Sequence, residues 1–229
     1  MSRAFSGWTE QAFELLLQLE GSPSQEARET RRKDRERLVR QPMIALLNDV
    51  ADADAAYEDF SVWGFRKDPW WWQHQAAVIR IARNVEIGLR FDLDGLLIRG
   101  GWSYPDPGQI PSFREAVSAR DTGPGLAHAV EALGARGYGI TGDIMKRMPR
   151  GYDAGHPRAD LLRHRSVLAV RPLGGDCAEH TPALVDAVLR AAKELDPLLS
   201  WLAEHVTGPA AAASADPPHG VASVGSPHG

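Results

Sequence analysis

Hydrophobic positions recur at helical spacing through the N-terminal part of the chain. Phe13, Leu16 and Leu17 form one apolar face, and the Gly-Ser-Pro segment 21–23 ends that helix. Ser24 is a predicted N-cap for a second helix, which Pro42 interrupts or restarts. The predicted helices of this region are 9–20, 24–40 and 43–50.

The middle of the chain changes to short runs of β-branched and aromatic residues separated by turn signals. Asp94-Gly95, with apolar residues on both sides, is the strongest hairpin signal. The predicted strands are 59–66, 73–83, 87–93 and 96–102. They indicate a meandering antiparallel sheet.

The remaining part of the chain alternates between both patterns. The predicted helices are 111–120, 125–136, 158–164, 182–193 and 197–206, and the predicted strands are 138–141 and 166–173. From Thr207 onward Ala, Pro, Gly, Ser and His dominate without apolar periodicity. We therefore expect one α+β domain over residues 1–206, a central antiparallel sheet packed by helices, and a disordered tail over 207–229.

Composition narrows the class of protein. The 229 residues carry a net charge of -4, which argues against a nucleic-acid partner. The single cysteine, Cys177, excludes an intramolecular disulfide framework. The N-terminal residues do not resemble a signal peptide, and no apolar run is long enough to span a membrane. These features predict a cytoplasmic protein and leave its oligomeric state open.

A dense group of charges follows the predicted strand 138–141. The loop from Lys146 to Asp160 contains Arg147 and Arg150, whose guanidinium groups suit a carboxylate or phosphate. The same arginines could instead pair with neighbouring aspartates and fix an irregular loop to the sheet. We take Arg147 and Arg150 as candidate substrate-binding residues.

The segment Lys-Arg-Met-Pro-Arg-Gly-Tyr-Asp-Ala-Gly-His-Pro-Arg-Ala-Asp-Leu-Leu-Arg, residues 146–163, resembles the signature of the DUF2461 family. The order of elements from Phe5 to Val206 is also similar to that family. The family usually carries a second, cationic motif before the hairpin, of the type Arg-Asp-x-Arg-Phe-x-x-Asp-Lys-x-Pro-Tyr-Lys. Here aromatic residues replace most of it in residues 62–75. We therefore expect this member to have lost or redirected whatever activity that motif serves.

Aromatic residues gather in that divergent region. Trp70, Trp71 and Trp72 are consecutive, so on a strand they could not all face one side, and at least one should be exposed or line a cavity. With Trp63, Trp102 and Tyr104 they could form a pocket for a flat or apolar ligand, or they could pack in the core.

The candidate catalytic residues are His74, His156 and Asp153. Both histidines stand in charged or aromatic segments, and imidazole is the usual acid or base near neutral pH. His156 could instead begin the short helix, and His74 could be a packed, hydrogen-bonded residue. Cys177 is a poor nucleophile candidate because Asp176 and Glu179 oppose thiolate formation.

Metal and cofactor signals are weak. His156 and Asp160 have helical spacing but no second histidine in register, so we predict no metal site. Residues 137–142 fit G-x-G-x-x-G, yet a strand runs through them and no helix opens on the last glycine. We predict no cofactor.

The sequence thus favours a small-molecule enzyme with cofactor-independent acid/base chemistry, such as a cyclisation, isomerisation or hydrolysis in a biosynthetic pathway. Its ligand would be anionic or aromatic. The alternative is a non-catalytic protein that binds a protein or nucleic acid through basic faces. An enclosed pocket reached by Arg150 and the tryptophan run favours the first. An open basic face joining Arg31, Arg35 and Arg150 favours the second.

Overall fold

The computed structural model describes residues 4–64, 71–175 and 179–207. It confirms the predicted α+β class, with a six-stranded antiparallel sheet in the order β1-β2-β3-β4-β6-β5. The strands are β1 Phe60–Val62, β2 Gln75–Ala82, β3 Val85–Asp92, β4 Gly95–Trp102, β5 Gly139–Thr141 and β6 Val167–Gly174. The helices are α1 Glu10–Gln18, α2 Gln25–Arg35, α3 Gln41–Ala53, α4 Gln109–Ser118, α5 Gly123–Ala135, α6 Ala159–Leu162 and α7 Leu184–Leu202, with shorter turns η1 Glu36–Arg40, η2 Ala55–Tyr57 and η3 Ala203–Thr207. Beyond Thr207, the predicted tail lies outside the described residues.

The predicted hairpin at Asp94-Gly95 joins β3 to β4. Its two-residue loop is Leu93-Asp94, and Asp92 pairs with Gly95. An Asp92 Oδ1 atom accepts the Asp94 N–H at 2.9 Å, which orders the turn. Gly95 has a φ of 96°, and a Cβ there would come within 1.9 Å of the Gly174 carbonyl oxygen. A side chain at this position would therefore push β6 away.

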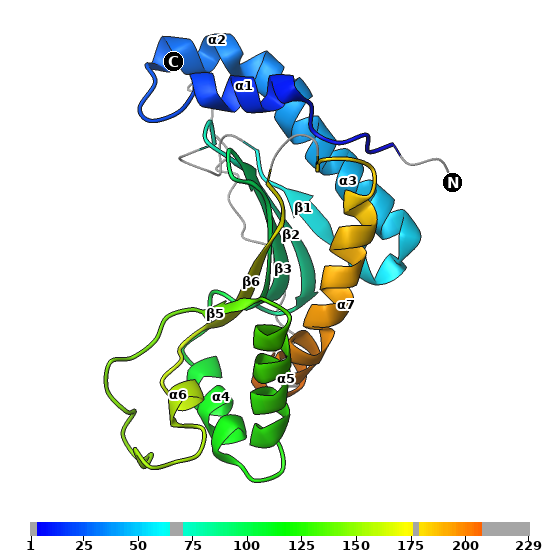
Figure 1. The fold of residues 1–229 in the computed structure, drawn as a ribbon. Coiled ribbons are helices and arrows are strands. Elements are labelled where there is room, and N and C mark those ends of the chain that lie inside the picture. The colour runs from blue at the N-terminus through cyan, green and yellow to red at the C-terminus, as the bar shows by residue number, and fades with distance from the viewer. Residues whose placement is uncertain (1–3, 65–70, 176–178, 208–229) are drawn as a thin grey trace, which may run out of the picture.

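Helices surround the sheet unevenly (Figure 1). α3 and α7 lie along one face, α1 and α2 lie at one end, and α4 to α6 lie at the other. α7 packs directly on β4, where a Cβ on Gly100 would stand 2.7 Å from a Leu195 methyl carbon. The hydrophobic core fills the space between α3, α7 and this face of the sheet. The other face carries the pocket described below.

Two prolines change the predicted helix boundaries. A π-helical turn, η1, joins α2 to α3 just before Pro42, so the helix passes through the proline without stopping. Such a wider turn accommodates a residue that cannot donate a backbone hydrogen bond. The prediction of two separate helices over 182–193 and 197–206 is wrong, because α7 continues through Pro197. Buried Leu195, Leu198 and Leu199 hold that helix on the core on both sides of the proline. Among the described helices none is both long and apolar enough to cross a bilayer.

Candidate functional site

Side chains alternate between the two faces of the sheet, as the pleat requires. Along β3, Ile87, Leu89 and Phe91 are buried in the core. Gly88 and Arg90 therefore belong to the opposite face. The register pairs Gly88 with Val78 on one side and with Arg99 on the other, so these three residues lie in one row across that face.

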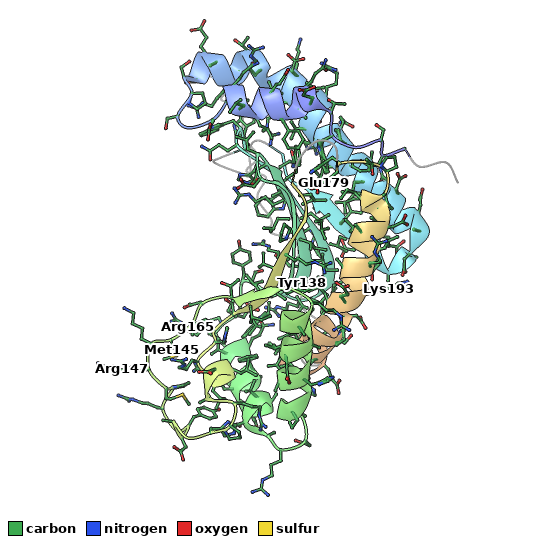
Figure 2. All side chains as sticks on the ribbon, viewed as in Figure 1. Tyr138, Met145, Arg147, Arg165, Glu179 and Lys193 are labelled. Carbon is green, nitrogen blue, oxygen red and sulfur yellow. The ribbon has the colours of Figure 1, made fainter. Side chains whose placement is uncertain are left out.

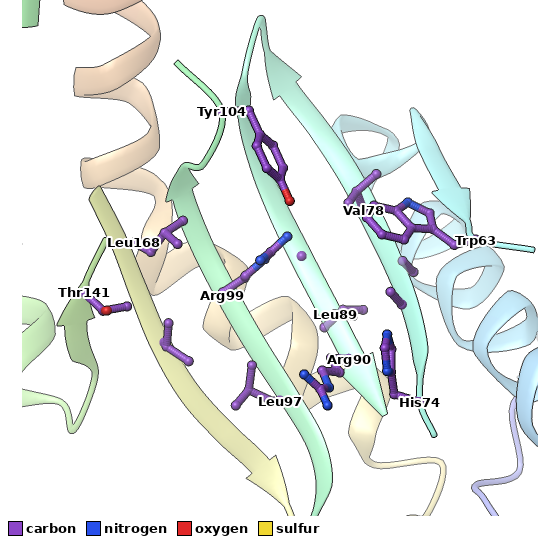
Figure 3. Close-up of a pocket in the computed structure, with 14 residues that line it drawn as sticks. Trp63, His74, Val78, Leu89, Arg90, Leu97, Arg99, Tyr104, Thr141 and Leu168 are labelled. Atoms are coloured by element: carbon purple, nitrogen blue, oxygen red, sulfur yellow. The ribbon is translucent and has the colours of Figure 1, made fainter. Parts of the chain in front are cut away.

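A pocket of about 370 Å³ lies on this open face (Figure 3). Its floor is made by small and aliphatic residues of β2, β3, β4 and β6, and polar and aromatic side chains stand around it. The lining residues are Trp63, His74, Ala76, Ala77, Val78, Gly88, Leu89, Arg90, Leu97, Arg99, Tyr104, Thr141, Leu168 and Val170. An apolar floor with a few polar groups is typical of a small-molecule site.

Arg99 crosses the middle of the pocket floor. A Cβ on Gly88 would come within 2.5 Å of Arg99 Nε and 3.0 Å of its Cγ, so the side chain lies directly over this glycine. One Nη atom contacts a Glu86 carboxylate oxygen at 3.5 Å, and 31% of the Arg99 side chain is exposed. Among the described residues this is the guanidinium group's only ion pair or hydrogen bond. Its remaining N–H donors are available to an anion in the pocket.

A second arginine stands nearer one end of the pocket. Arg90 is diagonal to Arg99 in the sheet register, and its Nε contacts an Asp92 carboxylate oxygen at 2.8 Å. His74, the residue before β2, lies beside Arg90 in the close-up (Figure 3). The structure therefore brings the predicted histidine into a pocket, together with two arginines that the sequence analysis did not single out.

Two aromatic rings border the same floor. Trp63 follows β1 and stands by Val78, while Tyr104 follows β4 and its hydroxyl points toward Arg99 (Figure 3). Tyr104 is 65% exposed, so its ring is accessible from solvent. Both residues belong to the predicted aromatic cluster. Planar rings on either side of an apolar floor suit a flat ligand.

The tryptophan run lies at the α2 end of the molecule. Trp70 is outside the described residues. Trp71 and Trp72 are buried, and the guanidinium groups of Arg35 and Arg28 lie over their rings at 5.2 and 4.2 Å. Trp71 lines a second pocket, of about 450 Å³, with charged residues of α2 and η1, as expected for at least one member of the run. Neither ring lines the pocket on the open face.

Trp102 belongs to the core. It is completely buried on the face that packs against the helices, and its ring contacts Phe113 at 5.2 Å between centroids. Its indole N–H donates to Gln109 Oε1 at 3.2 Å. The strand alternation places Trp102 on the side opposite Arg99, so it does not form a wall of the pocket.

The charged loop lies at the other end of the sheet, beside α4 and α6. Figure 2 shows Arg147 pointing outward from it. Arg147 and Arg150 are exposed, with no ion pair or hydrogen bond to any residue the structure describes, and neither lines the pocket. Asp153 is exposed and accepts the Gly155 N–H, and His156 Nδ1 accepts the Arg158 N–H at 3.0 Å in the turn that precedes α6. The ligand-binding and catalytic roles of these four residues stay predictions.

Other arginines, in this loop and just after it, hold the structure of the region. Arg158 donates to the carbonyl oxygens of Val117, Ser118 and Ala119 at 2.6, 3.1 and 2.8 Å, and so caps the C-terminus of α4. Arg165 pairs with Asp143 at 2.8 Å. Arginines that fix the irregular loop are therefore present, but they are not Arg147 and Arg150.

The arginines for an open basic face do not come together. Arg31 is exposed, but Arg35 is only 3% exposed, and Arg150 lies at the opposite end of the sheet. Within the described ranges, no three His, Cys, Asp or Glu side chains gather as a metal site would require.

A family model described as "Conserved hypothetical protein (DUF2461)" matches residues 65–201. The chain belongs to the DUF2461 family. Comparison with curated proteins and with solved structures found no match to this chain. The DUF2461 match confirms the resemblance drawn from the charged loop. It includes Arg90, Arg99 and Tyr104, whereas α2 and Trp63 precede it.

Proposed function

We propose that this DUF2461 protein binds a small anionic molecule with a flat apolar part on the open face of its sheet. The observation that carries the proposal is Arg99, a half-buried guanidinium group laid over Gly88 in the pocket floor. Its long contact with Glu86 satisfies only a fraction of its donors. A carboxylate could accept two parallel hydrogen bonds from such a group.

The surroundings of Arg99 define the rest of the ligand. Val78, Leu97, Leu168 and Val170 provide an apolar floor, and Trp63 and Tyr104 provide rings at its border. An aromatic or conjugated ring would bury apolar surface on this floor while its carboxylate reached Arg99. An aromatic carboxylate is therefore the ligand class that this geometry favours.

We further propose that His74 transfers protons in a cofactor-independent reaction of the bound molecule. Imidazole exchanges protons near neutral pH, and His74 lines the pocket beside Arg90. A neighbouring guanidinium group would stabilise an enolate or another anion that forms when a proton is removed. Isomerisation of a carbon acid is the simplest reaction of this kind.

Binding is tested by calorimetric titration with naphthalene-2-carboxylate and its neutral analogue naphthalene-2-carboxamide. We expect the carboxylate to bind more tightly, by about tenfold or more, because it gains a charge-assisted contact worth about 1.5–3 kcal/mol. Equal affinity for the two compounds would contradict an anion site.

Proton transfer is tested with phenylpyruvate, which combines a ring, a carboxylate and an acidic carbon. We expect the protein to accelerate incorporation of solvent deuterium at C3, and His74→Asn to abolish the acceleration even at saturating phenylpyruvate. Unchanged exchange in the variant would remove the catalytic role of His74 and leave the binding proposal standing.

A further inference from the structure

We infer that Arg35 and Gln75 are positioning residues, which together fix Trp63 and His74 as one wall of the pocket. The inference deepens the proposed function and rests on it for its effect on ligand binding. Both residues are buried, at 3% and 1% exposure, and neither lines the pocket on the open face. They contact the backbone of the wall residues from the buried side.

The wall itself has little support from regular structure. Trp63 follows β1, an edge strand of three residues, and His74 precedes the first residue of β2. Beyond the last paired residue of β1, the Trp63 N–H donates to the Ala76 carbonyl oxygen at 3.0 Å, which extends the pairing by one residue. Short edge strands fray readily, so two neighbouring pocket residues depend on other contacts for a fixed position.

Gln75 supplies the first of these contacts. Its Nε2 donates to the carbonyl oxygen of Trp63 at 2.8 Å and to that of Ala76 at 2.9 Å. Its Oε1 accepts from Arg35 Nη1 at 3.2 Å. The amide therefore joins the end of β1 to the beginning of β2 and is itself oriented by α2.

Arg35 supplies the second contact. Its other Nη atom donates to the His74 carbonyl oxygen, and the guanidinium carbon lies 5.2 Å from the centre of the Trp71 ring. A single planar group thus holds His74 directly and Trp63 through Gln75. The rigid geometry of the guanidinium group transmits the position of α2 to both residues.

Burial of these polar groups argues for a positioning role. Moving a guanidinium group out of water is costly, and apolar side chains of similar size often stabilise a fold as well or better. A buried polar network instead favours one arrangement of the groups that it joins. Here that arrangement sets the distance between a ring and an imidazole in the pocket.

The experiment compares Gln75→Met and the double variant Arg35→Met/Gln75→Met with wild type. The double variant removes the buried guanidinium group together with the amide, so it keeps the test valid if the single variant unfolds. Tyr138→Phe is the matched control, because it removes a partly buried side-chain hydrogen bond of 2.9 Å to Glu194 next to β5, at the sheet edge opposite β1.

The first measurement needs no ligand. NMR signals of the Trp63 indole and the His74 imidazole, assigned with Trp63→Phe and His74→Asn, should shift in both Gln75 variants and stay unchanged in Tyr138→Phe. The second is the affinity for naphthalene-2-carboxylate, which should fall about tenfold in the folded Gln75 variants and stay at the wild-type value in Tyr138→Phe.

Unshifted Trp63 and His74 signals in folded Gln75 variants would overturn the inference. Wild-type affinity of these variants for naphthalene-2-carboxylate would also overturn it, provided that Arg99→Gln weakens binding. If wild type does not bind the carboxylate and Arg99→Gln changes nothing, the proposed function fails. The NMR signals alone then decide whether Arg35 and Gln75 position the wall.

Discussion

Arg99 and Gly88 are cross-strand partners, and the arginine side chain lies flat across the glycine. Any side chain at position 88 would occupy the space of the guanidinium stem, since even a methyl carbon would come within 2.5 Å of Arg99 Nε. The glycine therefore determines where the cation of the pocket lies.

Gly88→Ala should displace Arg99 without harming the fold. Arg99 is flexible enough to move, and alanine in a strand is favoured over glycine by about 0.5–1 kcal/mol. We expect the affinity for naphthalene-2-carboxylate to fall about tenfold, while the urea midpoint stays equal or rises. Gly139→Ala on β5 is the control, because its Cβ would meet nothing closer than 3.8 Å. Wild-type affinity in Gly88→Ala would show that the position of Arg99 does not matter.

The charged loop should contain arginines with unequal effects on stability. Arg158→Ala removes three charge-assisted hydrogen bonds to the end of α4 and should lower the free energy of unfolding by about 2–4 kcal/mol. Arg150→Ala removes an exposed side chain and should change it by less than about 0.5 kcal/mol. Urea unfolding followed by circular dichroism measures both. Similar losses in the two variants would refute the capping role of Arg158.

Tyr138 should make stability fall at high pH. Burial, and then its hydrogen bond to Glu194, raises the pKa of the Tyr138 hydroxyl well above 10 in the folded protein. The folded state therefore keeps a proton that the unfolded chain releases, so stability is complete below pH 10 and declines as pH rises above it.

The measurement is the free energy of unfolding between pH 8 and pH 11 in wild type and Tyr138→Phe. At pH 8 the variant should be less stable by about 1 kcal/mol, because one hydrogen bond is lost. The difference should shrink toward pH 11. A constant difference across this range would contradict the raised pKa of Tyr138.

The sequence predicted the class and order of elements well, because the period of the hydrophobic pattern is a local property. The register of the hairpin was harder to predict from the sequence. A loop centred on Asp94-Gly95 would pair Arg90 with Arg99, whereas the observed loop is Leu93-Asp94 and pairs Arg99 with Gly88. The close approach of Gly174 to Gly95 is a tertiary contact that no local pattern reports.

The residues of the proposed pocket were predicted only in part for the same reason. His74, Trp63 and Tyr104 attracted attention as chemistry-bearing residues, and the fold brings them to one pocket. Arg90 and Arg99 were missed because each is the single cationic residue of its strand, without a charged cluster around it. Their alternation with buried residues was the available signal, since it places them with Gly88 on the face opposite the core. The denser charges near Arg150 were instead taken as the candidate anion site, although they lie away from that pocket.

The most direct test of the anion site is the affinity of wild type and Arg99→Gln for naphthalene-2-carboxylate and naphthalene-2-carboxamide, measured by calorimetry. Glutamine keeps hydrogen-bonding capacity and removes the charge. We predict that Arg99→Gln weakens carboxylate binding about tenfold or more and changes carboxamide binding by less than about twofold. Equal effects on the two ligands, or no effect on either, would contradict the account.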